Sequence, residues 1–153
     1  MAQTMGNVIV GQSGGPTAVI NSSLAGVYKT ARDRGAKKVF GMLHGVQGLL
    51  EEQVVDLSQH IRSDLDIDLL KRTPSSFLGS CRFKLPEIKD DQTIYDKIFA
   101  ILDKLEIEYF FYIGGNDSMD TIKKLSDYAI LNGSRIRFMG VPKTIDNDLA
   151  VTD

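Results

Sequence analysis

Three charged side chains within six residues could act together on a phosphate. Lys143, Asp146 and Asp148 lie in the sequence PKTIDND at 142–148. A lysine neutralises phosphate charge, a carboxylate accepts a hydroxyl proton, and Mg2+ bridges carboxylates and phosphates. This combination is typical of phosphoryl transfer. The spacing alone is equally compatible with an exposed turn in which Asp146 or Asn147 caps the backbone through side-chain hydrogen bonds.

Two pairs of glycines, Gly14–Gly15 and Gly114–Gly115, precede segments with helical periodicity. Glycine lets backbone N–H groups approach a ligand because it has no Cβ, and the positive end of the following helix attracts anions. One such pair alone is more typical of tight packing at a turn. Two pairs that follow strands of one sheet favour phosphate binding.

Regular elements must position these loops, and the sequence alternates short apolar runs with longer segments of helical periodicity. The pattern predicts an α/β fold: an open, mostly parallel sheet with helices on both faces. The predicted strands cover residues 7–10, 38–43, 109–113 and 135–141. The predicted helices run from Ile20 to Ala31 with a stop at Gly35, from Asp64 to Lys71, from Ile94 to Leu105, and from Ile122 to Ala129 with an end at Asn132 and Gly133. Between Gly45 and Leu70 the pattern is mixed.

Three polar loops, at 11–17, 114–118 and 142–148, follow predicted strands. In open parallel sheets, ligands bind in the crevice outside the carboxyl ends of the strands. We therefore expect all three loops to face one crevice.

Composition sets limits on the class of protein. With 153 residues, 42% of them hydrophobic and 25% charged, the chain can form one globular domain. A net charge of -2 provides no general attraction to nucleic acid or to an anionic membrane. No apolar stretch approaches the roughly 20 residues that cross a bilayer. Cys81 is the single cysteine, and the first residues lack the pattern of a signal peptide, so we expect a cytoplasmic protein.

Four segments resemble the phosphofructokinase family: SGGPTAVIN, SSFLGSCRF, IGGNDSMDT and GVPKTIDNDL. They occur in the family's order, and the resemblance runs from Gly6 to the last residue. It implies a fold of two similar lobes, with residues 1–153 as the first lobe and the second lobe absent. It also implies transfer of a phosphoryl group to the 1-hydroxyl of fructose 6-phosphate, and a homo-oligomeric parent enzyme.

The resemblance assigns roles to individual residues. Asp146 is similar to the catalytic base that takes the proton from the sugar hydroxyl. Thr144 and Asp148 resemble residues that hold the sugar. Arg82 corresponds to an arginine that contacts the phosphoryl group in flight, a role that suits guanidinium geometry; without the motif, an exposed surface arginine would be the better interpretation. Gly14–Gly15 resemble the first phosphate-binding turn.

Two substitutions indicate the phosphoryl donor. ATP-dependent members read PGTIDND and GGDGS, whereas this chain has Lys143 and Asp117 at two of those glycines, as the pyrophosphate-dependent branch does. Asp117 would place negative charge where the α-phosphate of ATP lies, and Lys143 would attract a small, highly charged donor. Together with Gly114–Gly115, residues Asn116, Asp117 and Ser118 form the second predicted donor-binding loop.

One departure concerns the predicted Mg2+ cofactor. The family's magnesium-associated aspartate is replaced by Asn116, which is neutral and a poorer ligand. Asp117 is then the candidate ligand, directly or through water. The alternatives are an ATP-dependent enzyme and a noncatalytic phosphate-binding or regulatory module. A Rossmann dinucleotide domain does not fit the glycine spacing. Because the chain stops at Asp153, we expect a fragment with little or no turnover alone.

Overall fold

The computed structural model describes residues 6–12, 18–61 and 85–142, without the side chains of residues 18–23, 60, 116 and 117. Within these ranges the chain forms a five-stranded sheet of order β3-β2-β1-β4-β5. The strands are β1 (Asn7–Gln12), β2 (Val39–Met42), β3 (Val54–Asp56), β4 (Ile107–Gly114) and β5 (Arg137–Pro142). All neighbouring pairs are parallel except β2 and β3, which are antiparallel.

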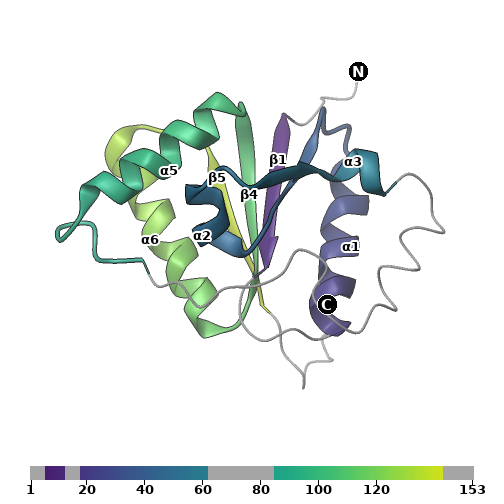
Figure 1. The fold of residues 1–153 in the computed structure, drawn as a ribbon, viewed down its shortest axis with the longest axis horizontal. Coiled ribbons are helices and arrows are strands. Elements are labelled where there is room, and N and C mark those ends of the chain that lie inside the picture. Colours follow the sequence, from purple (N-terminus) through teal and green to yellow (C-terminus); the bar gives the residue numbers. More distant parts are fainter. Residues whose placement is uncertain (1–5, 13–17, 62–84, 143–153) are drawn as a thin grey trace.

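Helices cover both faces of the sheet, as Figure 1 shows. They are α1 (Ala18–Asp33), α2 (Gly45–Leu50), α3 (Leu57–His60), α5 (Gln92–Lys104) and α6 (Asn116–Asn132). Helices α1 and α3 lie on one face, and α2, α5 and α6 lie on the other. The predicted fold class, an open and mostly parallel α/β sheet covered on both faces, is confirmed.

The two faces have separate hydrophobic cores because successive strand residues point to opposite sides. Ile9 and Phe110 pack with α5 and α6, whereas Val8 and Val10 pack with α1. Buried tyrosines also form hydrogen bonds between elements. For example, the Tyr28 hydroxyl donates to the Ile61 carbonyl at 2.7 Å. The strands that lead to the site are therefore fixed from both sides.

Local signals explain where the helices begin and end. The Asp91 carboxylate caps α5 by accepting a hydrogen bond from the Thr93 N–H at 3.0 Å. Gly133 ends α6 with a φ of 69°, in the left-handed region that glycine adopts without strain. The predicted end of this helix at Asn132 and Gly133 is confirmed.

The mixed stretch after Gly45 forms three short elements that the sequence pattern did not predict: α2, β3 and α3. Two glycines obscure α2, since glycine lowers helix propensity. One of them, Gly48, is required by packing, because a Cβ there would lie 1.5 Å from the Leu43 carbonyl oxygen. The helix predicted from Asp64 to Lys71 lies outside the described residues.

Candidate active site

Three neighbouring strands, β1, β4 and β5, end at the same edge of the sheet. Gln12, the last residue of β1, pairs with Ile113 in β4, and Gly114, the last residue of β4, pairs with Pro142 at the end of β5. Neighbouring strands lie about 4.8 Å apart. The three strands therefore end at adjacent points of the carboxyl edge, where the sequence predicts the polar loops to begin. The first strand is longer than predicted, because Gly11 and Gln12 belong to β1.

The predicted site residues divide into two groups. Gly114, Gly115 and Ser118 are described in full, and Asn116 and Asp117 are described as backbone in the first turn of α6. The others lie outside the described residues: Gly14, Gly15, Arg82, Lys143, Thr144, Asp146 and Asp148. The roles predicted for these seven therefore rest on the sequence and on the strand ends from which their loops leave.

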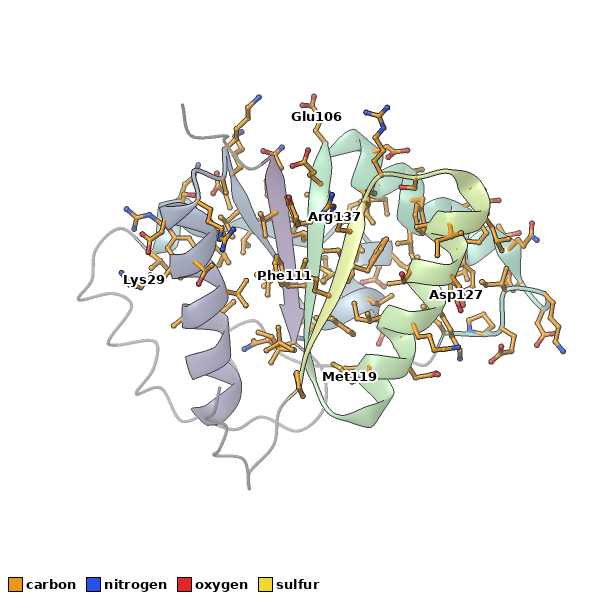
Figure 2. All side chains as sticks on the ribbon, turned by 180° about the vertical axis from the view of Figure 1, so that it is seen from behind. Lys29, Glu106, Phe111, Met119, Asp127 and Arg137 are labelled. Atoms are coloured by element: carbon orange, nitrogen blue, oxygen red, sulfur yellow. The ribbon has the colours of Figure 1, made fainter. Side chains whose placement is uncertain are left out.

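The start of α6 is held closely against β5. A Cβ on Gly140 would lie 2.4 Å from the Met119 sulfur, so the glycine in the strand leaves room for the first turn of the helix. Figure 2 shows Met119 at this end of the sheet and Glu106 at the opposite end. This packing places the helix start next to the end of β5, where the PKTIDND loop begins.

Gly115 is the N-cap of α6, with φ -92° and ψ -151°. This conformation is open to other residues, and a Cβ there would meet nothing within 4 Å among the described residues. Neither backbone conformation nor described packing accounts for this glycine. Gly115 has no side chain with which to cap the helix start. The N–H groups of the first turn point out of the helix and, with the helix dipole, suit an anion.

Three buried polar side chains belong to the end of β1 and the first two turns of α6. In the described part of the chain they are Gln12, Ser118 and Thr121, which are 0%, 1% and 6% exposed. No buried side-chain nitrogen or oxygen atom described in the structure lacks a hydrogen-bond partner. Ser118 was predicted from its motif, but Gln12 and Thr121 were not. A glutamine that ends the apolar strand NVIVGQ was the available signal.

A metal site is not formed by the described side chains alone, since among them no three His, Cys, Asp or Glu residues are grouped to hold an ion. The oxygen atoms of Asn116 and Asp117 are the kind of ligands that Mg2+ takes. Both residues stand at the helix start beside the open space at Gly115. The types of these two residues therefore fit a magnesium ion.

A cavity of about 540 Å3 lies at the opposite, amino edge of the sheet. It is lined by the start of β4 and by the turn between α6 and β5, including Glu106, Glu108 and Arg135. These charged residues are exposed. Ligands of parallel α/β sheets bind at the carboxyl edge, so this cavity is separate from the candidate site.

No helix in the described ranges is both long enough and apolar enough to span a membrane.

An open α/β sheet with glycine-rich loops at its carboxyl edge is typical of the class of domains that bind phosphate groups. The chain belongs to the phosphofructokinase family, whose profile matches residues 7–153. It is 46% identical over 149 residues to the pyrophosphate–fructose 6-phosphate 1-phosphotransferase of Rhodospirillum rubrum, covering 97% of this chain and 35% of the relative. An ATP-dependent 6-phosphofructokinase of Aliivibrio salmonicida is 37% identical over 141 residues, covering 92% of this chain and 39% of that relative.

The fold is also similar to solved structures. The crystal structure of a pyrophosphate-dependent phosphofructokinase from Nitrosospira multiformis matches with a TM-score of 0.82 and 39% sequence identity. The match covers 92% of this chain and 34% of that chain. This chain thus spans about a third of the length of the pyrophosphate-dependent relatives that it matches.

Proposed function

We propose that this chain is the amino-terminal part of an enzyme that transfers a phosphoryl group from pyrophosphate to the 1-hydroxyl of fructose 6-phosphate. One observation carries the proposal: the GGNDS and PKTIDND loops leave neighbouring, parallel strands at one edge, with Gly114 paired to Pro142. The names of the similar pyrophosphate-dependent enzymes support the same reaction.

The residues of the two loops suit the chemistry. Asp146 accepts the proton of the sugar 1-hydroxyl as its oxygen attacks a phosphorus atom of pyrophosphate. The bond from that phosphorus to the bridging oxygen breaks, and orthophosphate leaves with the electron pair. Thr144 and Asp148 hold the sugar. Fructose 1,6-bisphosphate and orthophosphate are the products.

Positive groups stabilise the charge that spreads over the phosphoryl oxygens. Arg82 contacts the transferred group, and Lys143 stands beside the donor. The glycine turns, Gly14–Gly15 and Gly114–Gly115, offer backbone N–H groups to donor phosphates. Asp117, with Asn116, would hold Mg2+, which neutralises donor charge when bound.

The proposal also covers the compartment, the oligomeric state and the pathway of the enzyme. We propose a cytoplasmic, homo-oligomeric enzyme of glycolysis, of which the 153-residue chain alone has little or no turnover. The chain spans about a third of its pyrophosphate-dependent relatives, so the remaining contacts to the sugar phosphate would come from outside it. A steady-state assay of the isolated chain tests this point, and strong turnover would contradict it.

The donor assignment is tested by steady-state kinetics of the full-length enzyme with fructose 6-phosphate and Mg2+. We expect a higher kcat/KM with pyrophosphate than with ATP. Changing both Asp117→Gly and Lys143→Gly should move the preference toward ATP, because a negative charge leaves the α-phosphate position and a positive charge leaves the pyrophosphate site.

The matched control removes one positive and one negative charge elsewhere on the same lobe. Lys123→Ala with Asp127→Ala changes an exposed ion pair on α6, with the Lys123 Nζ 3.8 Å from the Asp127 Oδ2. This control should leave the donor preference unchanged. An unchanged preference in the Asp117 and Lys143 variant as well would overturn the role of these two residues in donor choice. A wild-type preference for ATP would overturn the donor assignment itself.

A further inference from the structure

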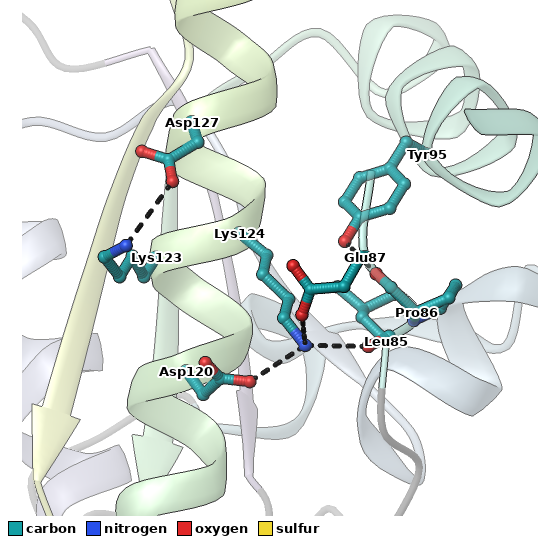
Figure 3. A network of polar contacts seen from close by, with 8 residues as sticks. All are labelled: Leu85, Pro86, Glu87, Tyr95, Asp120, Lys123, Lys124 and Asp127. Atoms are coloured by element: carbon teal, nitrogen blue, oxygen red, sulfur yellow. Dashed lines mark hydrogen bonds and ion pairs between the residues drawn. The ribbon is translucent and has the colours of Figure 1, made fainter. Parts of the chain in front are cut away.

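Two adjacent lysines on α6 have very different surroundings (Figure 3). The side chain of Lys123 is 77% exposed, and its Nζ lies 3.8 Å from the Asp127 carboxylate. The side chain of Lys124 is 13% exposed and makes three polar contacts. The Lys124 Nζ lies 3.0 Å from the Asp120 carboxylate, 2.9 Å from the Leu85 carbonyl oxygen and 3.3 Å from the Glu87 carboxylate.

Two of these three contacts reach a segment that is distant in sequence. Leu85 and Glu87 precede α5, whereas Asp120 belongs to the same helix as Lys124. The hydrogen bond with Asp120 raises the pKa of Lys124, so the ammonium group stays charged at neutral pH. An ammonium group has three donors, and Lys124 directs one to each of three acceptors.

The segment at Leu85–Glu87 is held by further contacts. The Leu85 side chain is buried in the core formed by α5 and α6. The Tyr95 hydroxyl donates to the Pro86 carbonyl at 2.5 Å. Burial raises the pKa of Tyr95 to about 12, so this hydroxyl remains a donor. Each of the three residues is thus fixed by a different contact.

The segment Leu85–Glu87 lies close in sequence to a predicted catalytic residue. Arg82 precedes Leu85 by three residues, and three residues of chain span at most about 11 Å. Lys124 stands eight residues after Asn116, the first residue of α6, which is about 12 Å along the helix axis. One rigid helix therefore carries both the predicted donor-binding turn and the attachment point of the Arg82 segment.

We propose that Lys124 is a positioning residue: it fixes Leu85–Glu87, the segment that follows Arg82, against the same helix that begins with the predicted donor-binding turn. The proposal rests on the proposed function for the role of Arg82. Lys124 itself does not touch the substrate. Its contribution is to limit where the guanidinium group can be placed.

The first test measures the segment directly, without any assay of activity. Cys81 is the single cysteine, so a nitroxide label attached to it in the 153-residue chain reports on the residue next to Arg82. In Lys124→Met, which keeps an aliphatic stem, we expect a shorter rotational correlation time for the label. Lys124→Arg should restore the slower motion, because a guanidinium group can again donate to Leu85 and the two carboxylates.

Lys123→Met is the matched control, since it removes the same charge from the preceding residue of the same helix. It should leave the spectrum of the label unchanged. Asp120 and Glu87 are 45% and 60% exposed, so water can solvate both carboxylates once Lys124 is removed, and the variant should fold. Glu87→Gln removes one contact from the segment side and should give a smaller increase in mobility. Equal mobility in wild type, Lys124→Met and Glu87→Gln would overturn the proposal.

The second test uses the full-length enzyme. A misplaced transition-state contact lowers kcat with little change in KM, and a displacement of about 1 Å can cost up to about 100-fold. We expect kcat to fall about 10- to 100-fold in Lys124→Met, with KM values near wild type and partial recovery in Lys124→Arg. A kcat equal to that of Lys123→Met would overturn the proposal. If wild type has no turnover with either donor, the proposed function fails, and the labelled chain still decides whether Lys124 fixes the segment.

Discussion

Polar side chains are buried at the carboxyl edge of the sheet and exposed at the amino edge. Gln12, Ser118 and Thr121 are enclosed where β1 ends and α6 begins. At the amino edge, Glu106 and Arg135 line a cavity of about 540 Å3 but remain exposed. Burial of a polar group costs free energy unless it is hydrogen-bonded. In the described ranges every buried side-chain nitrogen and oxygen atom has a hydrogen-bond partner, so the carboxyl edge holds ordered polar groups, whereas the charged groups at the amino edge are solvated.

The largest effect is expected from Asp146 at the carboxyl edge. Asp146→Asn removes the proton acceptor, and general base catalysis contributes about 10²- to 10⁴-fold. We expect a loss of kcat of that size in the full-length enzyme, with the KM for fructose 6-phosphate nearly unchanged. Asp127→Asn on the exposed face of α6 is the control and should keep wild-type kinetics. A loss below tenfold for Asp146→Asn would remove this residue from the role of base.

A smaller effect is expected from a substitution of Gly115, which tests ligand binding and packing independently. Gly115→Ser adds a Cβ that meets nothing within 4 Å among the described residues, and a hydroxyl that can accept from the N–H groups of the first turn of α6. Serine is a favourable N-cap, so we expect a free energy of unfolding equal to or above that of wild type. Donor binding should weaken, because the hydroxyl competes with phosphate for those N–H groups. Pyrophosphate titrations with thermal unfolding measure both effects.

Gly48 provides the contrasting result for the same type of change. Gly48→Ala would bring a Cβ to 1.5 Å from the Leu43 carbonyl oxygen, so the backbone must move. We expect a loss of about 1–3 kcal/mol in stability, the usual cost of overpacking. If Gly115→Ser lowers stability as much as Gly48→Ala, then packing accounts for both glycines. If donor affinity is also unchanged, Gly115 has no part in phosphate binding.

The elements that carry the site follow from local sequence patterns. The run YFFYI at 109–113 predicts a strand covered on both faces, and it lies within β4, which the structure extends to Ile107–Gly114. The apolar periodicity from Ile94 to Leu105 predicts α5, which the structure places at Gln92–Lys104. Their parallel order then brings the polar loops to one edge without any further information.

Other features depend on contacts between distant residues and could not be predicted. Lys124 meets Leu85 across 39 residues of sequence, and the local pattern shows only two adjacent lysines. Likewise, α2 begins without a helix-start signal in the sequence, because its N-cap residue is His44 rather than Ser, Thr, Asp or Asn. His44 has a φ of 60°, and Gly45 also has a positive φ. Sequence motifs indicated which residues could do chemistry, whereas the contacts that hold them depend on packing.

The smallest effect is expected at the amino edge, where two helices end differently. Gly133 ends α6 with a φ of 69°, whereas Glu106, just after α5, has a φ of 57°. Left-handed backbone costs a residue with a Cβ roughly 1–2 kcal/mol, and glycine avoids most of that cost. Because glycine also makes the unfolded chain more flexible, we expect Glu106→Gly to stabilise the protein by about 0.5 kcal/mol in urea denaturation.

Glu106→Gln separates charge from conformation at this position, since it keeps the left-handed strain and removes the carboxylate. It should change stability by less than about 0.5 kcal/mol, as is usual for exposed substitutions. Both variants should keep the wild-type kcat and KM, because the amino edge lies at the far end of the strands from Gly114 and Pro142. A fall in kcat with either variant would place a functional group in the amino-edge cavity. Burial of polar side chains would then no longer distinguish the two edges.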